Sequence, residues 1–133
     1  MEFIETPVFS KSWSGLCTEA ELRELQAVLI ANPEAGDPVP GLRGIRKLRW
    51  AASGRGKRGG ARVMYTLLPD DRRRGTYWCC LLLLAYPKNA QDDLTSDQAR
   101  ALARLAETIV HEIPRYSDRL RTSAHPSFPR SDS

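Results

Sequence analysis

The chain has 133 residues, of which 41% are hydrophobic, which is enough apolar material for one compact core but not for two. With 20 Lys and Arg residues against 16 Asp and Glu residues, the net charge of +4 favours a polyanionic partner. The longest apolar run, Cys79 to Tyr86, is far too short to span a bilayer, and the N-terminus lacks the features of a signal peptide. We therefore expect a single cytoplasmic domain with no membrane partner.

The basic charge is concentrated in one part of the chain, which is typical of a phosphate-binding surface. The segment from Pro38 to Pro69 has no acidic residue but eight basic ones: Arg43, Arg46, Lys47, Arg49, Arg55, Lys57, Arg58 and Arg62.

The three cysteines, Cys17, Cys79 and Cys80, form neither a disulfide framework nor a spaced metal knuckle. We expect reduced, buried thiols and no metal or other cofactor.

The first elements are a strand and one or two helices. Phe3 to Thr6 is short and stopped by Pro7, which predicts a strand at a sheet edge. Thr18 and Glu21 form a capping box, and the apolar spacing that follows predicts a helix from Thr18 to Ala31. A shorter helical turn is expected around Phe9 to Trp13.

Three strands are predicted next. The proline- and glycine-rich segment 32–44 excludes regular structure and indicates a connecting loop. Segment 45–50 is predicted to be a strand with one basic, solvent-facing side, and 51–60 a basic hairpin loop. Segments 62–68 and 76–86 form a hairpin with its tip at 69–75, and the second, nearly all apolar, suits a central strand.

The last predicted element is a helix that is capped by Thr95, carries one apolar stripe and ends at Pro114. Residues 114–133 are rich in Ser, Pro and Arg and are expected to form a flexible tail. Residues 1–113 therefore make an α+β domain. Its small antiparallel sheet packs against an N-terminal helix or helix pair and a C-terminal helix.

Five segments carry a resemblance to a known family. They are EFIETPVF (2–9), NPEAGD (32–37), GIRKLRW (44–50), GRGKRGGARVMY (54–65) and AYPKNAQDDLT (85–95). In their order and spacing, the chain resembles the RelE/ParE toxin superfamily, and specifically its HigB-like branch, from Met1 to about Ile113. The tail lies outside this likeness.

The resemblance implies a microbial ribonuclease-like fold and a function in a type II toxin–antitoxin system. Such a toxin is an mRNA interferase, a metal-independent endoribonuclease that enters the ribosomal A site, cleaves mRNA and inhibits translation. The implied partners are the ribosome with its mRNA and a cognate helix-turn-helix antitoxin. Operator DNA is contacted only through that antitoxin.

RNA supplies its own nucleophile, the 2′-hydroxyl, so cleavage needs a base, cations for the phosphorane and an acid for the leaving 5′-oxygen. Lys57 is the preferred base, because the neighbouring cations Arg55 and Arg58 lower the pKa of a lysine. The alternative interpretation of Lys57 is a solvated loop lysine. Arg62, just after Gly59 and Gly60, is assigned the transition-state charge, since a guanidinium grips two phosphate oxygens. The alternative interpretation of Arg62 is a strand-end arginine paired with an acid.

Two further residues complete the predicted catalytic set. Lys88 follows the strand that ends at Tyr86 and is a candidate acid or second phosphate contact, provided that this strand pairs with the Arg62 strand. Tyr86 stacks on a base or orients the substrate, or it is simply a half-buried sheet residue. Which of Lys57, Arg58 and Lys88 is base and which is acid stays open. The predicted RNA-binding residues are Arg46, Lys47, Arg49 and Arg55.

Two other functions remain open at this stage. A ParE-like protein has the same fold without nuclease activity and acts on a protein target such as DNA gyrase. A non-toxic RNA-binding module is the other alternative, although the basic segment has only Trp50 as a stacking platform. His111 and His125 are not expected to take part in catalysis.

Overall fold

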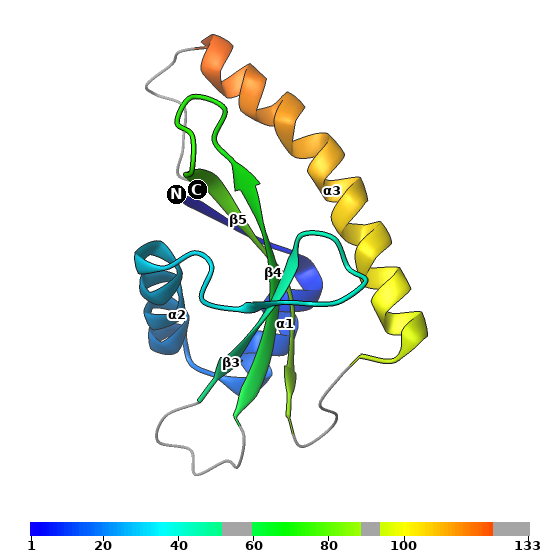
Figure 1. Cartoon of the computed structure of the whole chain (residues 1–133). Coiled ribbons are helices and arrows are strands. Elements are labelled where there is room, and N and C mark those ends of the chain that lie inside the picture. The colour runs from blue at the N-terminus through cyan, green and yellow to red at the C-terminus, as the bar shows by residue number, and fades with distance from the viewer. Residues whose placement is uncertain (52–59, 89–93, 124–133) are drawn as a thin grey trace.

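The computed structural model describes residues 1–51, 60–88 and 94–123, with residues 113–123 described by their backbone alone. The elements are β1 (Glu2–Glu5), α1 (Pro7–Leu16), α2 (Glu19–Ala31), β2 (Asp37–Pro38), β3 (Ile45–Trp50), β4 (Ala61–Pro69), β5 (Tyr77–Pro87) and α3 (Ser96–Ser123). The strands form one sheet in the order β1-β5-β4-β3-β2. Helices α1 and α2 cover one face and α3 the other (Figure 1). The predicted α+β class is confirmed.

Both N-terminal helices begin at threonine caps. The Thr6 hydroxyl accepts a hydrogen bond from the Phe9 N–H at 2.9 Å and donates one to the Leu83 carbonyl at 2.8 Å. This cap, followed by proline at the first helical position, makes α1 a full helix of ten residues where the sequence predicted only a turn. The predicted α2 is confirmed, with the reciprocal bonds between Thr18 and Glu21 in place.

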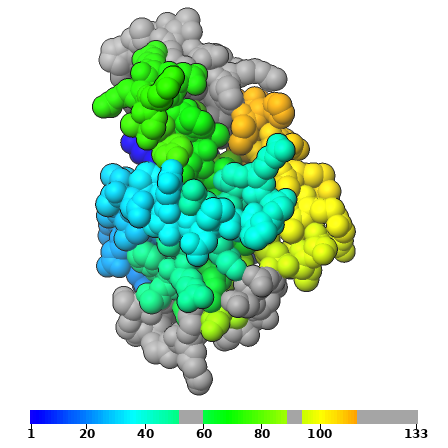
Figure 2. Space-filling view, viewed as in Figure 1, coloured from blue at the N-terminus to red at the C-terminus, as the bar shows by residue number. Residues whose placement is uncertain are grey.

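The sheet is antiparallel except at one edge. Strand β5 lies between β1 and β4, as predicted for a nearly apolar strand, and β1 pairs with it in parallel. The turn between β4 and β5 lies near one end of the molecule (Figure 2). The expectation that segment 32–44 has no regular structure was wrong, because β2 pairs there with β3. This two-residue strand tolerates Pro38 because it lies at the sheet edge.

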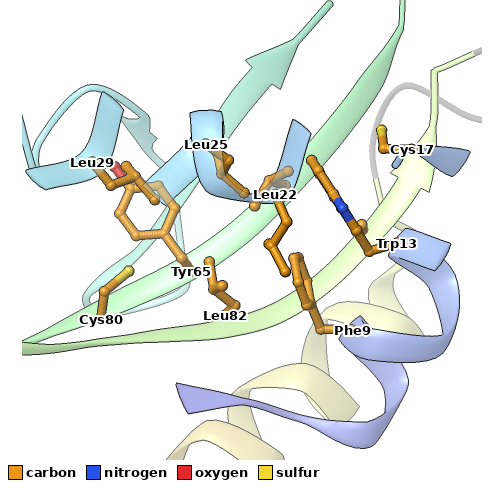
Figure 3. Packing of buried hydrophobic residues seen from close by; sticks show 11 residues of the cluster. Phe9, Trp13, Cys17, Leu22, Leu25, Leu29, Tyr65, Cys80 and Leu82 are labelled. Atoms are coloured by element: carbon orange, nitrogen blue, oxygen red, sulfur yellow. The ribbon is translucent and has the colours of Figure 1, made fainter. Parts of the chain in front are cut away.

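The core has two parts, one on each face of the sheet. On the α1 and α2 face, Phe9 and Trp13 stack with their ring centroids 5.6 Å apart, and fully buried Leu25 and Leu82 pack nearby (Figure 3). On the α3 face, Leu102 and Ala106 pack onto β4 and β5. A register shift in the β4–β5 pairing places both Leu83 and Leu84 on this second face.

Helix α3 extends farther than predicted. The sequence placed its end at Pro114, but the backbone stays helical to Ser123, so the first part of the expected tail is helix. A proline removes one backbone donor and disfavours the turn before it, but helices can continue through a proline. Although α3 has 28 residues, no helix in the described part of the chain is long and apolar enough to cross a membrane.

Candidate functional site

Three predicted site residues lie opposite one another across the three longest strands. Arg49 of β3 pairs with Arg62 of β4, which in turn pairs with Tyr86 of β5. Directly paired residues share a sheet face, and Tyr86 belongs to the core on the α3 side. Arg49, Arg62 and Tyr86 therefore form one row on the α3 face, which we call the cross-strand row.

The cross-strand row combines two cations in different environments. Arg62 is buried, with 3% of its surface exposed, whereas Arg49 is exposed. Side chains directly opposite in an antiparallel pair have their Cβ atoms about 5 Å apart, so two long side chains that start there can reach the same ligand group. In this conformation, Arg49 is the cation that a ligand would meet first.

Lys88 lies next to the start of β4, as predicted. Its backbone N–H donates to the Gly60 carbonyl at 3.1 Å, which continues the antiparallel pairing of β4 with β5 past the pair of Ala61 and Pro87. The Lys88 side chain is exposed. The exposed cations Arg49 and Lys88 therefore lie near the same end of the sheet, where β3 ends and β4 begins.

The basic residues of β3 are divided between the two faces. Lys47 and Arg49 share the α3 face with Ile45, whereas Arg46 pairs with Tyr65 and shares the opposite face. There, Arg46 Nη1 donates to the carbonyls of Gly36 at 2.7 Å and Glu34 at 3.4 Å.

The predicted single basic side of β3 was therefore wrong. Neighbouring residues in a strand point to opposite faces, so Arg46 and Lys47 cannot share one. The alternation in the sequence could have revealed this. In this structure, Arg46 holds the loop before β2. Lys47 and Arg49 are the candidate phosphate contacts of β3 on the α3 face.

Arg55, Lys57 and Arg58 lie outside the described residues, so their predicted roles remain predictions. In the sequence these three residues fall between β3 and β4, whose described ends, Trp50 and Ala61, pair one position beyond Arg49 and Arg62. Gly60, directly before β4, has a φ of 57°, and a Cβ there would lie 2.1 Å from the Trp50 carbonyl oxygen. Backbone approach therefore accounts for Gly60 without a bound phosphate.

The cysteines are core residues, as predicted. Cys79 and Cys80 are fully buried, and burial raises the pKa of the Cys79 thiol from 9.0 to about 12 and that of Cys80 still further. Both thiols are therefore protonated at neutral pH and poor nucleophiles. His111 is exposed on α3. Within the described ranges, no group of three or more His, Cys, Asp and Glu residues is arranged to hold a metal ion.

The chain matches none of the models of known protein families. The chemistry of the candidate site is therefore argued from the residues that form it. It consists of two arginines and a tyrosine in one row, with the exposed Lys88 directly after the end of β5. Such a set can bind a phosphodiester and stabilise added negative charge on it.

Proposed function

We propose that this protein is the toxin of a type II toxin–antitoxin module and acts as a ribosome-dependent endoribonuclease on mRNA. The observation that supports this most is the cross-strand row, which gathers Arg49, Arg62 and Tyr86 on one face of the sheet. The proposal also follows the resemblance to RelE and HigB toxins. A helix-turn-helix antitoxin that covers this face is the corresponding partner.

The proposed reaction uses the 2′-hydroxyl of the RNA as nucleophile. Its oxygen attacks the adjacent phosphorus while the bond to the 5′-oxygen breaks, which leaves a 2′,3′-cyclic phosphate and a 5′-hydroxyl. Lys57 accepts the proton of the 2′-hydroxyl, and Lys88 either donates a proton to the leaving oxygen or contacts the phosphate. Tyr86 orients the nucleotide.

The two arginines of the row have different roles toward the phosphate. Exposed Arg49 contacts the phosphodiester, and buried Arg62 contributes a fixed positive charge beneath it. A charge removed from water acts more strongly on its surroundings than an exposed one, because the protein screens it less. Arg62 therefore stabilises the phosphorane, and Arg49 positions it.

The test is induction of the chain in bacteria, with growth measured beside primer extension on a translated message. The variants are Arg49→Gln, Lys57→Gln and Lys88→Gln, and Arg104→Gln on the exposed face of α3 is the matched control. We expect growth arrest with new 5′ ends from the parent and the control. A catalytic variant should cleave about 10²- to 10⁴-fold less.

Three results would overturn the proposal. Growth arrest without new 5′ ends would indicate a ParE-like toxin with a protein target. Absence of arrest in a folded parent would indicate an RNA-binding module without toxicity. Cleavage that is unchanged in all three variants would place the chemistry elsewhere in the chain. Because Arg62 is buried, Arg62→Ala is informative only when its thermal unfolding midpoint is measured as well.

A further inference from the structure

The turn between β4 and β5 carries a second basic surface, which the proposed catalytic site does not use. Arg72, Arg73 and Arg74 follow one another there, and all three are exposed. We call them the tip arginines. Figure 2 shows this turn near one end of the molecule.

The backbone that carries the tip arginines is held by its own hydrogen bonds. The Asp70 N–H donates to the Thr76 carbonyl at 2.9 Å, and the Arg72 N–H donates to Asp70 Oδ1 at 2.9 Å. The Thr76 hydroxyl donates to the Arg73 carbonyl at 2.7 Å, and Gly75 takes the φ of 80° that closes the turn. A preorganised turn loses less conformational entropy when it binds a ligand.

The acidic groups near the tip are partly engaged. One oxygen of Asp70 accepts the hydrogen bond within the turn, and Glu34 Oε2 accepts one from the Tyr77 hydroxyl at 2.6 Å. Three arginines against Asp70 and Asp71 leave a formal charge of +1 on residues 70–74. Arginine side chains are longer than aspartate side chains, so the outermost charge of the turn is positive.

The tip and the cross-strand row lie at opposite ends of β4. Arg62 is near the start of this strand of nine residues and the tip follows its end, so about 26 Å separates them at roughly 3.3 Å per residue. The tip therefore cannot reach the phosphodiester bound at the row. Residues 70–76 contain no aromatic side chain on which a base could stack.

We propose that the tip arginines bind the phosphate backbone of double-helical RNA as an anchor separate from the cleavage site. Charge, exposure and a preorganised turn favour phosphates, and the lack of a stacking platform favours backbone over unpaired bases. This inference rests on the proposed function in one respect, since the RNA helix would be that of the ribosome. Its binding chemistry does not require cleavage.

The experiment compares the parent with the triple variant Arg72→Gln, Arg73→Gln, Arg74→Gln. The control is Lys11→Gln, Arg23→Gln, Arg104→Gln, which loses the same charge from exposed helix positions. Affinity for a fluorescent RNA hairpin and for intact bacterial ribosomes is measured at several salt concentrations. Circular dichroism melting confirms that each variant is folded.

We expect the tip variant to bind both probes more weakly than the control. The loss of three phosphate contacts makes the negative slope of log affinity against log salt shallower by about 2 to 3, and affinity at about 0.1 M salt falls on the order of 10²-fold. Affinity and slope equal to those of the control would overturn the inference, and a target such as an acidic protein would then be sought.

The two proposals can fail separately. Weaker RNA binding by the tip variant, with no mRNA cleavage by the parent, would sustain the anchor and refute the nuclease. Cleavage by the parent, with RNA binding unchanged in the tip variant, would sustain the nuclease and refute the anchor.

Discussion

Replacing Tyr65 with phenylalanine tests how the loop before β2 is held against the sheet. The Tyr65 side chain is fully buried, and its hydroxyl donates to the Pro33 carbonyl at 2.7 Å and accepts from the Gly36 N–H at 2.9 Å. Burial is the main reason that the pKa of this phenol is raised, so the hydroxyl is protonated and able to donate. Tyr65→Phe removes both bonds without removing the ring.

The expected loss of stability in Tyr65→Phe depends on the two backbone groups that lose their hydrogen-bond partner. Gly36 is buried, and a buried donor or acceptor that loses its partner costs about 1 to 3 kcal/mol. Pro33 is half-buried, so water partly replaces the bond to its carbonyl. We therefore expect Tyr65→Phe to lower the free energy of unfolding by about 2 to 4 kcal/mol.

The measurement is urea unfolding. The urea concentration at the midpoint is compared between variant and parent, provided that the free energy of unfolding depends on urea with the same slope in both. Tyr77→Phe is the matched control, because it removes one hydroxyl from an exposed bond to Glu34 and should change the stability by no more than about 1 kcal/mol. Equal losses in the two variants would refute the reasoning that burial decides the cost of the missing bond.

Three further predictions concern stability. Gly60→Ala should lower the free energy of unfolding by at least about 2 kcal/mol in urea, since its Cβ would overlap the Trp50 carbonyl at a positive φ. Thr18→Ala should cost about 1 kcal/mol in the same assay, because the Glu21 N–H at the start of α2 loses its cap. Between pH 9 and about 12, stability should fall as the pH rises, because the unfolded chain releases the Cys79 proton before the folded chain does. Cys79→Ala should make that decline shallower.

Each of these predictions has a result that would contradict it. A Gly60→Ala protein as stable as the parent would show that the hairpin closes differently from the structure. A Thr18→Ala loss no larger than that of Ser14→Ala, an exposed position within α1, would remove the role of the cap. If the free energy of unfolding of Cys79→Ala falls with pH as steeply as that of the parent, other groups dominate the loss of stability at alkaline pH.

The sequence by itself determined the elements whose causes are local. The capping box at Thr18 and Glu21 is contained within four residues, so α2 could be predicted with its start. The apolar run 79–86 implied a strand with neighbours on both sides, and β5 is that strand. The candidate site was predicted in part, since Lys88 does come beside the start of β4.

Pairing and packing decided the rest. The sequence did not indicate that Arg49, Arg62 and Tyr86 would form one row, because this depends on the register of β3 with β4 and of β4 with β5. Charge alone gave no sign that Arg62 is buried or that Arg46 binds the loop carbonyls at Glu34 and Gly36. Local propensity acts over a few residues, whereas the face and burial of a side chain depend on which distant strands and helices pack around it.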